Sequence, residues 1–150
     1  MQLKHINFAT SDVAGLGAFF ERYFAFKPLL ERGSGAFILM SNDEEFVLTL
    51  MKTKKQDPAI YPETFHIGFY VGDPAAVQAK HDELAAAGCS PGEIKHAGGN
   101  GRGTHFYCTA PGNVVVEIAT TPELHAAEQA GALRSWLSSV LVAISVTKSP

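Results

Sequence analysis

The chain repeats one stretch of its own sequence, and this repeat restricts the fold more than any other feature. The segment that begins at His5 reads His-Ile-Asn-Phe-Ala-Thr-Ser-Asp, and the segment that begins at His66 reads His-Ile-Gly-Phe-Tyr-Val-Gly-Asp. At this constant spacing the identical pairs are His5/His66, Ile6/Ile67, Phe8/Phe69, Asp12/Asp73 and Ala14/Ala75. A repeat of this kind indicates two copies of one supersecondary unit that share a core.

Each copy has the pattern of a strand, a helix and three further strands. Alternating apolar residues over Leu3–Phe8 predict the first strand, and Asp12 is placed to cap a helix over 13–24. In the second copy, Asp73 is placed to cap a helix over 74–87. Further strands are expected near 29–32, 36–40 and 45–51 in the first copy and near 90–95, 104–108 and 114–119 in the second. The fold class is therefore α+β, with two βαβββ modules forming a curved mixed sheet around a cavity.

A polar linker separates the two copies. Residues 52–62 carry two prolines, so we expect modules over about 1–55 and 63–120 within one domain over 1–120. Residues 121–150 place apolar side chains at near-helical spacing, which predicts a C-terminal helical extension. Two interpretations of this extension stay open, namely packing on its own domain and contact with a second copy of the chain.

The composition excludes several kinds of partner. The formal net charge is −3 and no basic run carries interleaved aromatic residues, so we expect no nucleic acid. We expect no signal peptide, and the apolar stretch from Val140 to Val146 is too short to cross a bilayer. Cys89 and Cys108 are too few for a disulfide scaffold. We therefore expect a cytoplasmic protein that does not contact a membrane.

Two matched histidines and one glutamate predict a metal site. His5 and His66 hold the same position in the first strand of each copy, and Glu117 lies in the last strand of the second copy among apolar neighbours. A buried carboxylate is costly unless it is paired, and a cation would pair it. If the two copies close towards each other, two imidazoles and one carboxylate can hold one divalent ion with open positions for substrate.

The first copy offers a different residue at the place of Glu117. Alignment of the last strands sets Thr49 at the equivalent position. A neutral hydroxyl is a poor ligand for a divalent ion, so we expect that position to be left for bound substrate.

Four segments of the chain together resemble one known superfamily. They are Leu3–Ile6, Phe19–Phe24, Phe65–Phe69, and Phe106–Tyr107 followed by Ala110–Glu117. In this combination, over roughly residues 1–120, the chain resembles the vicinal oxygen chelate superfamily, which includes glyoxalase I, fosfomycin-resistance proteins, bleomycin-resistance proteins and extradiol dioxygenases. The resemblance implies a homodimer and a divalent metal, Zn²⁺, Ni²⁺, Mn²⁺ or Fe²⁺, at His5, His66 and Glu117.

The resemblance also bears on the reaction. Glyoxalase I enzymes usually carry a glutamate or glutamine where Thr49 stands, which counts against that activity. The fosfomycin-resistance and extradiol branches use two histidines and one glutamate, and they commonly have a tyrosine at the place of Tyr107. The chain departs from the usual Asp-Pro turn, which reads Ala110-Pro111 here.

The remaining candidates belong to the substrate side of the site. Tyr107, with His105 beside the same strand, would donate a hydrogen bond or move a proton. Arg102, in a glycine-rich loop, would meet an anionic substrate, and Thr49 would face the open position.

Two functions remain in competition. The first is a metal-dependent enzyme of lyase, isomerase, transferase or dioxygenase type that acts on a small oxygen-bearing substrate. The alternative is a metal-free protein of the bleomycin-resistance type that sequesters a small molecule in a cleft lined by aromatic residues. The set of His5, His66 and Glu117 favours the enzyme.

Overall fold

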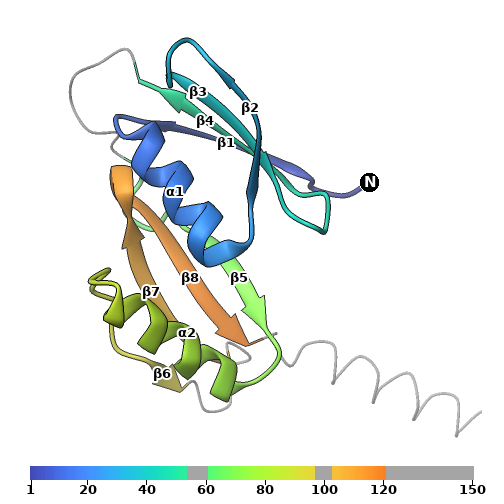
Figure 1. The fold of residues 1–150 in the computed structure, drawn as a ribbon. Helices are drawn as coiled ribbons and strands as arrows, with labels where there is room; N and C mark the ends of the chain where they lie inside the picture. The colour runs from blue at the N-terminus through green and yellow to red at the C-terminus, as the bar shows by residue number, and fades with distance from the viewer. Residues whose placement is uncertain (54–60, 97–102, 121–150) are drawn as a thin grey trace, which may run out of the picture.

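The structure of the chain is a computed structural model, and it describes residues 1–53, 61–96 and 103–120. The predicted C-terminal extension over 121–150 and Arg102 lie outside the described residues. Figure 1 shows two modules of similar build stacked along the molecule, each with one helix and one sheet. The predicted repeat is therefore confirmed.

The first module follows the sequence closely. Its elements are β1 (His5–Thr10), α1 (Val13–Phe24), β2 (Lys27–Arg32), β3 (Phe37–Ser41) and β4 (Val47–Lys52). The strands form one sheet in the order β1-β4-β3-β2, in which β1 runs parallel to β4 and the other pairs are antiparallel. The first strand of the module therefore lies beside its last.

The second module repeats this arrangement. Its elements are β5 (Ile67–Val71), α2 (Pro74–Ala86), β6 (Lys95–His96), β7 (Thr104–Ala110), the 3₁₀ helix η1 (Pro111–Asn113) and β8 (Val114–Thr120). The strand order is β5-β8-β7-β6, with β5 parallel to β8. The expected curved sheet is thus divided, within one chain, into two mixed sheets of four strands each.

Among the strands, β6 departs most from its predicted start. β6 starts at Lys95 rather than near Ser90. Pro91 has no N–H to give to a neighbouring strand, and the N–H of Gly92 donates to the carbonyl of Tyr107 at 2.8 Å. The segment therefore lies against β7 without forming a regular ladder there.

The predicted aspartate caps begin both helices. The Asp12 carboxylate accepts from the Gly15 N–H at 2.8 Å, and the Asp73 carboxylate accepts from the Ala76 N–H at 2.8 Å. Each cap satisfies an N–H that has no partner within its own helix. The helices of the two modules therefore begin in the same way.

α1 carries the contact between the two modules. Phe8 and Phe20 are fully buried between α1 and the first sheet. The ring of Phe24, one turn after Phe20 on the same helix, lies tilted against Phe69 of β5 with centroids 4.3 Å apart, and Phe20 lies 6.3 Å from the same ring. One aromatic cluster thus joins the two cores.

Cys89 and Cys108 are free thiols. Cys108 is buried and its Sγ donates to the Cys89 carbonyl at 3.2 Å. Burial, and secondarily the nearby Cys89, raise the pKa of the Cys108 thiol to about 11. Among the described helices, none is both long and apolar enough to cross a membrane.

The β7–β8 turn packs against the start of α1, and this contact generates a stability prediction. Gly112 has φ 73°, and a Cβ added there would overlap the hydroxyl of Thr10, which accepts from the Asp12 N–H at 3.1 Å. We expect Gly112→Ala to lower the free energy of unfolding by about 3 kcal/mol, from backbone strain plus steric overlap.

A matched glycine separates the two causes. Gly35 has φ 85° but no atom within 4 Å of an added Cβ, so Gly35→Ala should cost only about 1 to 2 kcal/mol. Urea unfolding followed by circular dichroism measures both. Equal losses for the two variants would contradict the close approach of Gly112 to Thr10.

Candidate metal centre

The strand register places the two modules in equivalent positions. Asn7 pairs with Thr49 across β1 and β4, and Gly68 pairs with Glu117 across β5 and β8. Since Asn7 and Gly68 stand at the repeat spacing, Thr49 holds the position in the first module that Glu117 holds in the second. The register agrees with the alignment made from the sequence.

His66 and Glu117 face each other at the outer strand of the second sheet. Nε2 of His66 lies 3.5 Å from Oε2 of Glu117, and Nδ1 of His66 lies 2.9 Å from the carbonyl oxygen of Thr64. A carbonyl only accepts, so Nδ1 carries the hydrogen, and in the neutral ring Nε2 presents its lone pair to the carboxylate. Two acceptor atoms so placed need a proton or a cation between them.

Tyr107 holds the other oxygen of the same carboxylate. It lies opposite Glu117 in the β7–β8 register, and its hydroxyl donates to Oε1 of Glu117 at 2.9 Å. On the other side, a Cβ added at Gly68 would stand 3.3 Å from Oε2, so a glycine here leaves room for the carboxylate. The Glu117 side chain is 18% exposed, which agrees with the predicted partial burial. We call His66, Glu117 and Tyr107 the half-site.

The donors of the half-site suit a divalent ion. An imidazole nitrogen whose other nitrogen is fixed by a carbonyl, beside a carboxylate oriented by a hydroxyl, is a common arrangement around protein-bound metals. The nitrogen and oxygen donors fit Zn²⁺, Ni²⁺, Mn²⁺ or Fe²⁺. The residues present therefore fit the predicted ion, and a third ligand is required to match the predicted set.

His5 lies apart from the half-site. Its Nε2 is 3.0 Å from Oγ1 of Thr49, and the Thr49 hydroxyl donates to Oδ1 of Asn7 at 2.7 Å. Within the described ranges, no three His, Cys, Asp or Glu side chains gather closely enough to hold a metal ion. One chain thus brings together two of the three predicted ligands, His66 and Glu117, and leaves His5 in the other module.

Of the remaining predicted residues, His105 lies in the second module and Thr49 in the first. His105 is buried beside the half-site, with its ring 5.6 Å from that of Tyr107 and its Nδ1 3.4 Å from the carbonyl of Gly103. Thr49 is buried beside His5 in the first module. Arg102 lies outside the described residues.

Two residues of the site were not singled out from the sequence. Asn7 contacts Thr49 in the first module, and Gly68 makes room for Glu117 in the second. The sequence does mark these two positions. Asn7 and Gly68 are equivalent in the repeat, two residues after the matched histidines, but they are different residues.

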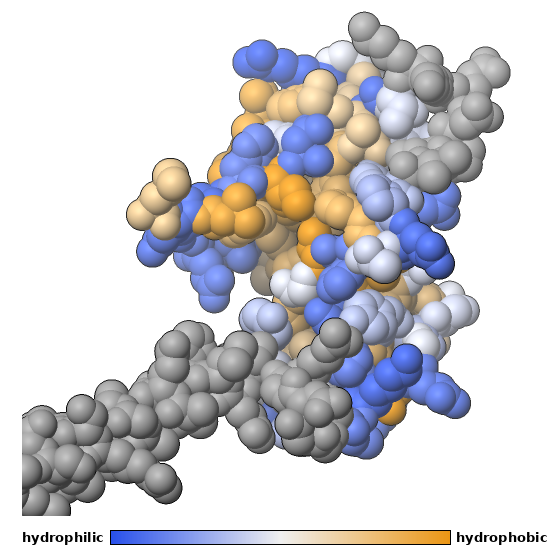
Figure 2. Space-filling view, turned by 180° about the vertical axis from the view of Figure 1, so that it is seen from behind, coloured by the Kyte–Doolittle hydropathy of each residue, from blue (hydrophilic) through white to orange (hydrophobic). Residues whose placement is uncertain are grey.

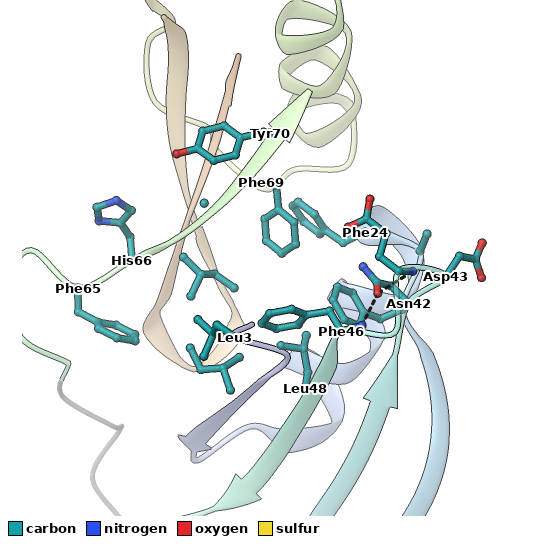
Figure 3. Close-up of a pocket in the computed structure, with 16 residues that line it drawn as sticks. Leu3, Phe24, Asn42, Asp43, Phe46, Leu48, Phe65, His66, Phe69 and Tyr70 are labelled. Atoms are coloured by element: carbon teal, nitrogen blue, oxygen red, sulfur yellow. Dashed lines mark hydrogen bonds between the residues drawn. The ribbon is translucent and has the colours of Figure 1, made fainter. Parts of the chain in front are cut away.

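A hollow of about 780 Å³ lies at the edge of β5 beside the half-site. His66 and Tyr70 project from one face of β5, and Phe69 projects from the other towards Phe24 (Figure 3). The wall is mainly apolar, with polar groups from the β3–β4 turn at Asn42. The hollow therefore opens where the outer strand of the second sheet meets the first module.

Known proteins match most of this chain in sequence pattern and in fold. Residues 2–118 match the Glyoxalase/Bleomycin resistance protein/Dioxygenase superfamily. A possible glyoxalase from Bacillus cereus is 32% identical, with a TM-score of 0.67 over 79% of this chain and 98% of that one. No protein with a curated description matches the chain.

Two more distant structures show likeness of fold alone. Lactoylglutathione lyase from Agrobacterium tumefaciens is 17% identical, with a TM-score of 0.63 over 79% of this chain and 92% of that one. A mutant of the fosfomycin resistance protein FosX from Listeria monocytogenes, in complex with Mn(II) and 1S,2S-dihydroxypropylphosphonic acid, is 18% identical, with a TM-score of 0.66 over 80% and 90%. The match over residues 2–118 is decisive, and the chain belongs to the Glyoxalase/Bleomycin resistance protein/Dioxygenase superfamily.

Proposed function

We propose that the protein is a divalent-metal-dependent enzyme that acts on a small oxygen-bearing substrate, by lyase, isomerase, transferase or dioxygenase chemistry. The observation that carries the proposal is the half-site, where Nε2 of His66 and Oε2 of Glu117 lie 3.5 Å apart. His66 and Glu117 would hold the ion, with His5 as the third ligand. When bound, such an ion supplies Lewis acidity to a substrate oxygen.

We propose that a second copy of the chain supplies His5. β1 and β5 are end strands of their sheets, so each has an edge that pairs with no strand within the described residues, and on β1 the Ala9 carbonyl accepts from the Tyr61 hydroxyl. Leu3, before β1, is 78% exposed, and Tyr70 of β5 is 59% exposed, although both line the apolar hollow. Covering this edge with a second copy would bury these side chains and bring the His5 of one chain towards the half-site of the other.

The proposed roles of the other side chains follow from their contacts. The Tyr107 hydroxyl orients Glu117 through its hydrogen bond at 2.9 Å, and it would donate its single hydrogen to a substrate oxygen only by releasing that bond. His105 would set the ring of Tyr107, which it meets edge to face. We place Arg102 and Thr49 on the substrate side, and Thr49 offers no carboxylate for a fourth ligand.

The alternative is a metal-free protein that sequesters a small molecule. The aromatic wall of the hollow, with Phe24, Phe46, Phe65 and Phe69, favours it. The half-site favours the enzyme, because it places an imidazole nitrogen and a carboxylate oxygen, two donor atoms that suit a divalent ion, next to each other.

The first prediction concerns metal content. The full chain, reconstituted with Zn²⁺ and dialysed, should retain about one ion per chain by elemental analysis, and His66→Ala should bind the ion at least about 100-fold more weakly. His96→Ala is the matched control, because His96 lies on β6 and contacts Thr104 rather than the half-site. Equal metal content in the two variants would remove the proposal.

The second prediction tests the contribution of a second copy. His5→Ala and His66→Ala chains should each lose the ion, but co-refolding them in equal amounts should restore about a quarter of the wild-type metal content. The restored sites are those that combine the His5 of one chain with the half-site of the other. A mixture that stays empty, alongside a wild-type chain that binds metal, would rule out sharing between chains.

A further inference from the structure

The first sheet has an open face, which we define as the side turned away from α1. Strand pairing arranges its side chains in rows across the four strands. One row contains Asn7, Thr49, Leu39 and Leu30, and the next contains Ala9, Met51, Phe37 and Arg32. The row before them contains His5, Val47, Ser41 and Lys27. The proposed ligand His5 thus shares this face with residues of β2, β3 and β4.

The open face becomes apolar with distance from His5. Leu39 and Phe37 on β3 are only half-buried, and Met51 and Leu30 are 46% and 39% exposed. The opposite face of the same strands is packed under α1, with Leu50 and Phe8 fully buried. In the view from behind, hydrophobic side chains gather over the first module (Figure 2). Neighbouring apolar side chains left exposed in this way mark a binding surface.

The equivalent row of the second module is polar. Gly68, Glu117 and Tyr107 stand in one row across β5, β8 and β7, where the first module has Asn7, Thr49 and Leu39. A leucine therefore replaces the tyrosine that orients the carboxylate. The two modules have the same strand arrangement but different side chains. The second module presents a carboxylate and a hydroxyl, and the first presents an apolar wall on β3 and β2.

The open face gives a compact anion little to bind beside His5. Within the described part of this face, the cations Lys27 and Arg32 both lie on β2, the strand farthest from β1. Lys27 is paired with Asp43 at 3.5 Å. The side chains next to Thr49 on this face are neutral, which suits an uncharged group.

From this arrangement we infer that the substrate joins its oxygen-bearing end to an apolar aryl or acyl body. The inference rests on the proposed function: the oxygens would lie at the ion, and the body would lie on Leu39, Phe37 and Met51. Strands stand about 4.8 Å apart, so the wall from Thr49 to Leu30 extends roughly 10 Å. This is the reach of a two-ring aromatic group.

A series of hydroxamic acids tests the inference, because each presents the same pair of oxygens to a metal and differs only in its apolar body. The probes are acetohydroxamate, benzohydroxamate and 2-naphthohydroxamate, titrated calorimetrically into the full chain with Mn²⁺ and, separately, with EDTA. We expect Kd to fall about tenfold at each step of the series, as the added rings leave water.

Two variants test whether the gain in affinity along the series comes from the open face. Leu39→Gln and Met51→Gln should each lose about tenfold in affinity for 2-naphthohydroxamate and bind acetohydroxamate as the wild type does. Acetohydroxamate is the internal control, because loss of folding or of the ion would weaken it as well.

The outcomes separate this inference from the proposed function. Equal Kd values for the three probes in Mn²⁺ would contradict the inference of an apolar body but would leave the proposed metal-dependent function intact. An affinity that increases along the series to the same extent with EDTA as with Mn²⁺ would support the apolar wall and count against the metal. Unchanged Kd values in both variants, with an altered mass by light scattering, would assign the face to a protein contact and overturn the inference.

Discussion

Parallel pairing of the first and last strands in each module is the constraint on which the site depends. In the second module it sets Gly68 beside Glu117 and brings His66, directly before β5, to within 3.5 Å of that carboxylate. Antiparallel pairing of β8 with β7 then adds Tyr107 from the other side. Residues far apart along the chain meet because a βαβββ module returns its last strand to its first.

The same parallel pairing occurs in both modules, but the residues that it brings together differ. In the first module, Asn7 and Thr49 take the places of Gly68 and Glu117 and form a neutral hydrogen-bonded pair beside His5. Asn7 stands where Gly68 leaves room for the carboxylate of Glu117, and its amide oxygen accepts from the Thr49 hydroxyl at 2.7 Å. Duplication of a frame followed by divergence of facing residues thus accounts for one polar and one apolar wall.

The sequence predicted the repeat, both helices with their caps, and the meeting of His66 with Glu117, because each depends on local pattern or on the repeat itself. It did not predict that His5 would stay apart, because strand pairing within a module says nothing about how two modules close. The late start of β6 depends on Pro91 and on the Gly92 contact with Tyr107, which periodicity does not reveal. Asn7 and Gly68 were missed because their contacts with Thr49 and Glu117 appear only once the register is known.

The central claim is that His66 and Glu117 bind a divalent ion together with the His5 of a second copy. Anomalous diffraction from crystals of the full chain grown with Zn²⁺ tests it most directly. The account predicts a peak roughly 2.0–2.2 Å from His66 Nε2, a Glu117 oxygen and the His5 ring of a neighbouring chain. A Zn²⁺ peak at other residues, with His66 and Glu117 in direct contact and His5 still bonded to Thr49, would contradict it.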